Sequence, residues 1–86
     1  HMGKVRVTGN GAYEFINSMF ANDLSRIQPG QAQYSMLCNE QGGIIDDLIV
    51  YLVSDTEVRF IPNASNAATV VSALESVLPD GVLLMA

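Results

Sequence analysis

The stretch Gln33–Tyr51, QYSMLCNEQGGIIDDLIVY, decides the fold because it has the form of two β-strands joined by a tight turn. The turn is predicted at Gly42-Gly43, since glycine adopts a positive φ without steric cost. Side chains alternate between the faces of a strand, so Asp46 and Asp47 lie on opposite faces of the second strand. Both faces are otherwise apolar, which predicts that this strand is covered on both sides.

The length of the loop decides which residues of the first strand share a face with Asp47. A loop of two residues or of four places Tyr34 on that face, whereas an odd loop or a bulge would reverse the assignment. The predicted patch is therefore Tyr34 and Tyr51 around Asp47, which suits a flat, amine-bearing ring better than a phosphate or a metal. The alternative is an aspartate that is merely solvated or paired with a base, which is the commoner situation for carboxylates.

Composition restricts the class of protein. The chain has 86 residues, of which 49% are hydrophobic, enough for one compact domain. A net charge of −5 with only four Lys and Arg disfavours nucleic acid and anionic membranes as partners. No apolar run is long enough to span a membrane, and no signal peptide is visible. Cys38, the single cysteine, is predicted to be a small buried hydrophobe. His1-Met2 resembles a cloning remnant, and without it no histidine is left for metal or acid–base chemistry.

The rest of the chain alternates between strand and helix patterns. Outside the hairpin we expect strands at 4–8, 57–63 and 82–85 and helices at 12–21 and 67–78. The order β-α-β-β-β-α-β predicts a two-layer α+β fold, with both helices on one face of the sheet and Tyr34 and Asp47 on the other. Asn10 is the predicted cap of the first helix, and Asn63 or Ser65 that of the second.

Four segments together resemble the folate-binding domain of the aminomethyltransferases, the T-proteins of the glycine cleavage system. They are ND after the first helix, PGQAQYS, CNEQGGIIDDLIVY and PNASN. Related domains occur in sarcosine and dimethylglycine dehydrogenases and in a non-catalytic folate-binding protein linked to iron–sulfur assembly. The resemblance is strong over Val7–Tyr51, continues through Asn66 and becomes looser toward the C-terminus. Family proteins are several times longer, so residues 3–86 are expected to be part of that domain, one half of a duplicated unit.

The resemblance implies an enzyme that transfers a methylene group from the aminomethyl-lipoyl arm of H-protein to tetrahydrofolate and releases ammonia. Asp47 matches the essential carboxylate of the family, and Asp46 is expected to serve structure. Four residues are implied to contact tetrahydrofolate: Tyr34, Ile49, Tyr51 and Asn63. For Asn63 a helix cap is an equally weighted alternative, because asparagine leads the ranking of capping residues.

A single half of the domain would leave one sheet edge unpaired and one apolar face uncovered. We therefore expect the fragment to be inactive alone and to self-associate. Two other interpretations stay open: a folate-binding module without transfer chemistry, and a purely structural α+β dimerisation domain. The resemblance places the parent protein in the bacterial cytoplasm, or in the mitochondrial matrix of a eukaryote.

Overall fold

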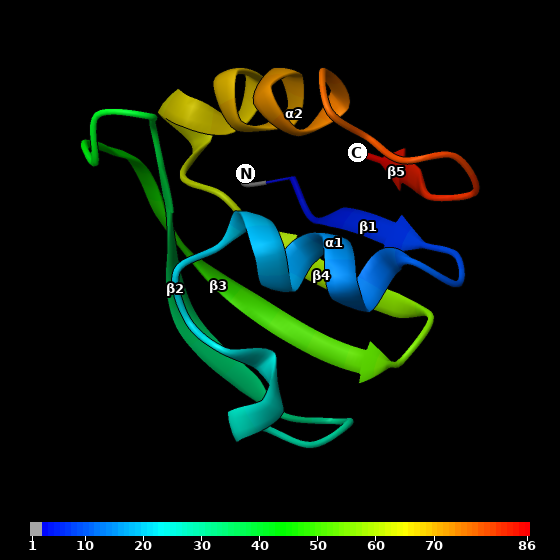
Figure 1. The fold of residues 1–86 in the computed structure, drawn as a ribbon. Coiled ribbons are helices and arrows are strands. Elements are labelled where there is room, and N and C mark those ends of the chain that lie inside the picture. The colour runs from blue at the N-terminus through cyan, green and yellow to red at the C-terminus, as the bar shows by residue number, and fades with distance from the viewer. Residues whose placement is uncertain (1–2) are drawn as a thin grey trace.

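A computed structural model describes residues 3–86 as an antiparallel sheet with two helices packed against it (Figure 1). The elements in chain order are β1 (Val5–Thr8), α1 (Ala12–Met19), β2 (Ala32–Cys38), β3 (Ile44–Ser54), β4 (Glu57–Ile61), α2 (Ala67–Glu75) and β5 (Leu83–Met85). The strands lie in the order β2-β3-β4-β1-β5, and every neighbouring pair is antiparallel. The predicted α+β order is confirmed. The expected cloning remnant, His1-Met2, lies outside the described residues.

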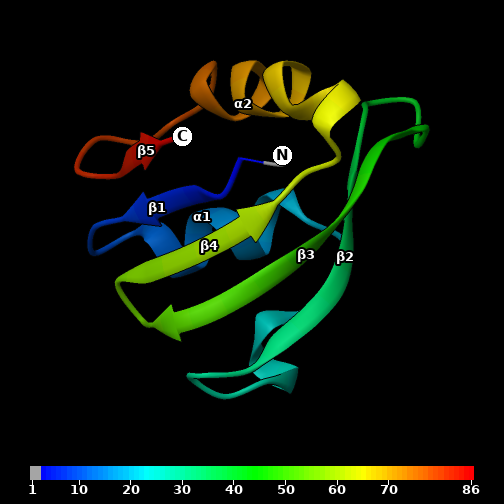
Figure 2. The ribbon, with the colours of Figure 1, turned by 180° about the vertical axis from the view of Figure 1, so that it is seen from behind.

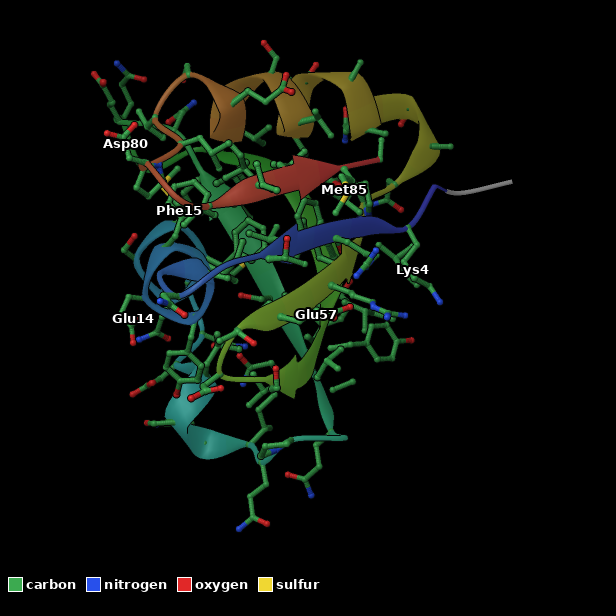
Figure 3. All side chains as sticks on the ribbon, turned by 90° about the vertical axis from the view of Figure 1, so that its right-hand side faces the viewer. Lys4, Glu14, Phe15, Glu57, Asp80 and Met85 are labelled. Carbon is green, nitrogen blue, oxygen red and sulfur yellow. The ribbon has the colours of Figure 1, made fainter. Side chains whose placement is uncertain are left out.

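One face of the sheet forms the core together with both helices. In Figure 1, α1 crosses in front of the sheet and α2 runs along one side of it. The buried core residues of the helices and the three central strands are Val5, Val7, Ala12, Phe15, Ile16, Leu48, Val50, Leu52, Val58, Phe60, Val70 and Leu74. Figure 3 shows Lys4 extending from the sheet on the side away from α1. Within residues 3–86, no helix is long and apolar enough to cross a membrane.

Both helices are shorter than predicted. The chain leaves α1 at Phe20, which is extended and forms a bridge with Leu37 of β2. This departure lets the ring of Phe20 pack edge-to-face on Phe60, with centroids 5.2 Å apart. The residue that caps α1 is Gly11, without a side-chain hydrogen bond, so the prediction that Asn10 is the cap was wrong.

The second helix ends at Glu75, one turn before its predicted end. Pro79 follows soon after, and a proline disfavours helical backbone at the residue before it. As a result Val77, which lay inside the predicted helix, follows the end of α2 and is 55% exposed. The strand predicted at 57–63 also ends early, at Ile61, because the buried Pro62 that follows has no N–H to donate to a ladder.

The hairpin loop has five residues, Asn39–Gly43, and not the predicted two or four. Asn39 closes it, because its backbone N–H donates to Gly43 O and its Oδ1 accepts from Gly43 N–H, both at 2.8 Å. Gly42 has a φ of +84°, as predicted for the turn.

An odd loop alone would have exchanged the faces of β3, but a bulge compensates for it. Leu37 pairs with Asp46, whereas Cys38 pairs with Ile44, so Ile45 is one extra residue on β3. The loop and the bulge together restore the parity. The prediction that Tyr34 and Asp47 share a face is therefore confirmed, although its premise of an even loop was wrong. Cys38, beside the bulge at the strand end, is exposed and not buried as predicted.

The second face of the sheet is open. On β3, Asp46 and the alternate residues that follow it are buried, whereas Asp47, Ile49, Tyr51 and Val53 are exposed. Seen from behind, no helix formed by residues 3–86 lies in front of β3 and β4 (Figure 2). The cover that apolar residues on both faces of β3 indicate is present on one side only, which agrees with the expectation that a single half of the domain leaves one apolar face uncovered. We call this surface the open face.

Self-association through the open face stays a prediction, and Ile49→Lys tests it. Ile49 is 39% exposed on β3, the strand between β2 and β4, so a charge there should disfavour burial of this face against a second copy. We expect wild-type chain to sediment as oligomers at high concentration, and the variant to shift toward monomer. Val77→Lys, at an exposed site after α2, is the control and should leave association unchanged. A monomeric wild-type protein would contradict the prediction.

Candidate functional site

The two adjacent aspartates occupy different environments. Asp46 is 2% exposed, whereas Asp47 is exposed on the open face. Asp46 accepts three hydrogen bonds: from the backbone N–H of Asn63 at 2.9 Å, from Asn63 Nδ2 at 2.8 Å and from Asn66 Nδ2 at 2.9 Å. Burial raises the pKa of Asp46, but these hydrogen bonds outweigh it and hold the pKa below its ordinary value.

Asp47 is held by a donor at each carboxylate oxygen. Its Oδ2 accepts from the hydroxyl of Tyr34 on the neighbouring strand, and its Oδ1 accepts from Asn63 Nδ2 at 3.0 Å. The hydrogen bond to Asp47, followed by the negative charge of that carboxylate, raises the pKa of Tyr34. A carboxylate has about four lone-pair positions, so Asp47 can still accept from a ligand.

A hollow of about 150 Å³ lies beside Asp47 on the open face. Its lining residues are Tyr34, Asp47, Leu48, Ile49, Ile61 and Asn63. The structure thus brings together four of the five predicted site residues. Asn63 precedes the 3-10 turn Ala64–Asn66, but its side chain makes no capping hydrogen bond and donates to both aspartates. Its contact with tetrahydrofolate stays a prediction.

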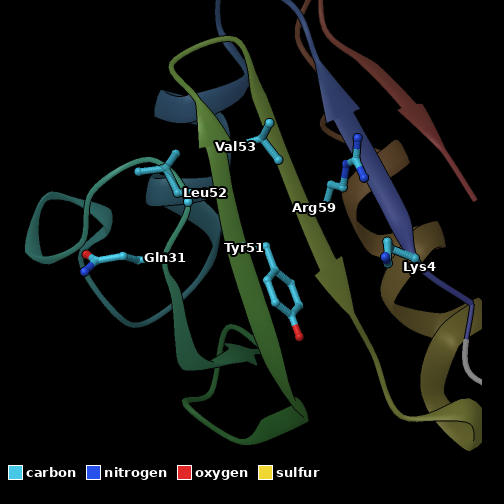
Figure 4. A pocket seen from close by; sticks show the side chains of 7 residues that line it. Lys4, Gln31, Tyr51, Leu52, Val53 and Arg59 are labelled. Carbon is cyan, nitrogen blue, oxygen red and sulfur yellow. The ribbon is translucent and has the colours of Figure 1, made fainter.

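Tyr51, the fifth predicted residue, lies away from this hollow. It is four residues beyond Asp47 on β3, which is about 13 Å along a strand. A second hollow of about 240 Å³ forms there, lined by Lys4, Gly30, Gln31, Tyr51, Leu52, Val53 and Arg59 (Figure 4). The predicted arrangement of two tyrosines around Asp47 is therefore wrong within this chain: Tyr34 contacts the carboxylate and Tyr51 belongs to the second hollow.

Positive charge gathers beside the second hollow. Three of the four basic residues of the chain, Lys4, Arg6 and Arg59, lie on β1 and β4 or next to them. Arg6 and Arg59 are directly opposite in register and share Glu57, at Nε–Oε2 distances of 3.1 and 2.6 Å. Hydrogen bonds first from Arg6 and then from Arg59 hold the pKa of Glu57 below its ordinary value. One carboxylate among three cations leaves this end of the open face positive.

The segment after α1 fixes the backbone at Tyr34. The Asn22 side chain donates to the backbone carbonyl of Tyr34, and the Asn22 N–H donates to the buried Ser35 hydroxyl at 3.1 Å. Asp23 instead caps the short 3-10 turn Leu24–Arg26 through the N–H of Ser25. Asn22 therefore connects the segment after α1 to the strand that carries Tyr34.

Acid should destabilise the fold through Asp46. The folded-state pKa of Asp46 is depressed, so the unfolded state binds more protons at low pH. The free energy of unfolding therefore decreases as the pH is lowered. The stabilisation is complete above the ordinary value of 3.8 and is lost as pH falls through the lower folded value. We expect urea unfolding midpoints of Asp46→Asn to be lower than wild type at neutral pH and to depend less on pH below about pH 5. Asp80→Asn, in an exposed turn, is the control that should keep the wild-type profile.

Comparison with known proteins agrees with the resemblance in the sequence. The chain matches the family model of the GCVT N-terminal domain over residues 1–85. The chain belongs to this family. An aminomethyltransferase of Mycobacterium avium (strain 104) is 56% identical over 82 residues, which are 95% of this chain and 22% of that protein. The aminomethyltransferase of Frankia alni is 55% identical over the same length.

A solved structure has the same fold as this GCVT N-terminal domain chain. The glycine cleavage system aminomethyltransferase T from Bartonella henselae matches it with a TM-score of 0.90 at 31% identity. The match covers 99% of this chain and 24% of that one. The chain thus spans less than a quarter of the length of the relatives cited here.

Sequence reasoning missed two lining residues of the hollow in this GCVT N-terminal domain, Leu48 and Ile61, and it missed Asn66, which lies outside the hollow. Ile61 lines the hollow because it pairs with Ile49 across β3 and β4, and alternation along the strand predicted at 57–63 could have found it. Asn66 donates a hydrogen bond to Asp46. The N-A-S-N spacing could have indicated this contact, because the short turn Ala64–Asn66 places the two asparagines on the same side.

Proposed function

We propose that this chain is the tetrahydrofolate-binding segment of an aminomethyltransferase of the glycine cleavage system. The parent enzyme would transfer a methylene group from the aminomethyl-lipoyl arm of H-protein to tetrahydrofolate and release ammonia. One observation carries the proposal: Asp47 is exposed in a hollow with Tyr34 and Asn63, in a family whose relatives include named aminomethyltransferases.

The residues of the hollow fit one ring of such a ligand. Ile49 and Ile61 supply an apolar wall, Asp47 supplies a charged acceptor, and Tyr34 supplies an aromatic ring beside it. Ligand pockets usually measure about 300–1,000 Å³. A hollow of about 150 Å³ therefore accommodates part of the ligand, and the rest of the pocket must come from other segments of the parent enzyme.

Asp47 has the chemical role in this proposal. Tetrahydrofolate supplies the amine nitrogens that accept the carbon, and positive charge develops on them as carbon–nitrogen bonds exchange. A fixed carboxylate stabilises such charge because its position requires no reorganisation during the reaction. Tyr34 and Asn63 hold the two oxygens of Asp47, and the hydrogen bond to Asp47 raises the pKa of Tyr34, so the hydroxyl stays a proton donor to that carboxylate.

Tyr51 fits a different part of the same ligand. It lies with Lys4 and Arg59 at the positive end of the open face. Tetrahydrofolate carries carboxylates at the end opposite its ring system, and these residues would attract them. In this arrangement Ile49 lies between the two hollows on the same strand face.

Titration of tetrahydrofolate into a full-length aminomethyltransferase that carries this segment tests the proposal. We expect saturable binding, and at least about tenfold weaker binding by Ile49→Asp, which places a second carboxylate in the apolar wall. Val77→Asp, away from the open face, should bind as wild type does. Binding without methylene transfer would favour the non-catalytic folate-binding module, and no binding would favour the dimerisation domain.

The 86-residue chain alone is expected to bind tetrahydrofolate weakly or not at all and to be inactive. Its hollow encloses only part of the ligand, and binding must also overcome the loss of translational and rotational freedom. The same titration on the isolated chain measures this. Affinity equal to that of the full-length enzyme would show that the missing segments contribute nothing to the site.

A further inference from the structure

The side-chain amide of Asn63 lies between the two aspartates. Its Nδ2 is within 2.8 Å of Asp46 Oδ1, 2.8 Å of the Asp47 backbone carbonyl and 3.0 Å of Asp47 Oδ1. The backbone N–H of the same residue donates to the second oxygen of Asp46 at 2.9 Å. Asp46 therefore holds Asn63 at two points, one on the backbone and one on the side chain.

These contacts determine which way the Asn63 amide points. A carboxamide has a donating and an accepting end, and in isolation either end can face a neighbour. An ionised carboxylate only accepts, so the amide nitrogen must face Asp46. The depressed pKa of Asp46 keeps that carboxylate ionised at neutral pH. Because Nδ2 has two hydrogens and both are directed at aspartate oxygens, Oδ1 is the atom of the carboxamide that remains to accept from a ligand.

We propose that Asp46 is a positioning residue for ligand binding: it fixes the Asn63 amide so that Asn63 Oδ1 accepts a hydrogen bond from a ring N–H of the ligand beside Asp47. This inference rests on the proposed function, in which that ring belongs to tetrahydrofolate. It gives the buried aspartate a part in recognition, through Asn63, without any contact between Asp46 and the ligand.

Asn66 separates this role from a purely structural one. It donates to the same oxygen of Asp46 at 2.9 Å, but it does not line the hollow beside Asp47. Removing its amide in Asn66→Ala weakens the same buried cluster and leaves the contact between Asp46 and Asn63 in place. This variant is therefore the matched control for loss of stability.

The test is a double-mutant cycle on the Kd of tetrahydrofolate in a full-length aminomethyltransferase that carries this segment. We expect Asp46→Asn and Asn63→Ala each to raise Kd about 3- to 10-fold, the effect of losing one hydrogen bond. Their combination should be no worse than Asn63→Ala alone, since Asp46 acts through Asn63. Asn66→Ala should lower the thermal midpoint and keep Kd within about twofold of wild type.

Each other outcome has a defined meaning. If the effects of Asp46→Asn and Asn63→Ala multiply, or if Asn66→Ala raises Kd as much as Asp46→Asn, Asp46 acts only on stability and the inference is overturned. If wild-type enzyme binds no tetrahydrofolate, the proposed function fails and the inference fails with it.

A second measurement does not depend on the folding of the variants. In a neutron structure of the wild-type enzyme with tetrahydrofolate bound, we expect Asn63 Oδ1 within hydrogen-bond distance of a ring N–H and both Nδ2 hydrogens facing the aspartates. Deuterium positions that place Nδ2 toward the ring would overturn the inference even if every variant unfolds.

Discussion

Asp47→Asn in a full-length aminomethyltransferase that carries this segment is expected to lower kcat for methylene transfer about 10²–10³-fold, because it removes a fixed charge from the reacting amines. Asparagine keeps the shape of the side chain and can still accept from Tyr34. Affinity for tetrahydrofolate should therefore fall less than the rate, since the apolar wall and the tyrosine remain. Kinetics of glycine cleavage with saturating H-protein, together with the Kd of tetrahydrofolate, measure both quantities.

The adjacent Asp46→Asn variant is the informative comparison, but it is not matched in fold damage. From the sequence the two changes look equivalent, because they are isosteric neighbours. In the structure Asp46 is buried and accepts three hydrogen bonds. The NH₂ group of an asparagine at this position would face N–H donors of Asn63 or Asn66, so those hydrogen bonds would be lost. Rates must therefore be compared at equal folded fraction, with the exposed Asp55→Asn as the control for charge. If Asp46→Asn then lost as much kcat as Asp47→Asn, the catalytic face would be wrongly assigned.

Phe60→Ala should cost about 3–5 kcal/mol of the free energy of unfolding, the range for a buried phenylalanine that leaves a cavity. Phe60 is fully buried on β4, between β3 and β1, and its ring meets Phe20 edge-to-face. Domains are stable by only about 0.05–0.15 kcal/mol per residue, so this loss is a large share of the total for a chain of this size. Urea unfolding followed by circular dichroism measures it.

Val53→Ala is the control for this experiment. Val53 lies on the open face of the neighbouring strand and is 40% exposed, so its truncation should cost less than about 1 kcal/mol. Similar unfolding midpoints for the two variants would mean that the core does not lie on the helical side of the sheet.

The sequence predicted the strand that matters and the face of Asp47, because alternation along a strand follows from backbone geometry alone. It could not predict the five-residue loop, because the compensating bulge at Ile45 depends on pairing with β2. The hydrogen-bonding role of the Asn63 side chain could not be predicted from local propensity either. Asparagine suits both a helix cap and a contact to the ligand, and only the pairing of β4 with β3 brings Asn63 to the two aspartates.

The separation of Tyr51 from Asp47 has a comparable cause. Two residues can share a face of a strand and still serve different hollows, since four residues extend about 13 Å. The exposure of the open face has another origin. Apolar side chains on both faces of β3 indicate coverage on both sides. The chain spans less than a quarter of the length of these relatives, and it covers β3 on one side only.

The near-identity of the two faces of β3 has a consequence for misfolding. Because both faces carry apolar residues, a slip by one residue would still bury a mostly apolar row with Ile49 in place of Leu48, although Tyr51 would then replace the smaller Val50 in the core. Such a slip would even keep one aspartate on each side. Polar contacts also oppose the slip. Asn39 closes the loop by hydrogen bonds to Gly43, and the side chains of Asn63 and Asn66 donate hydrogen bonds to Asp46. A slipped hairpin with Asp47 turned inward is therefore the misfolded competitor to expect when these asparagines are lost.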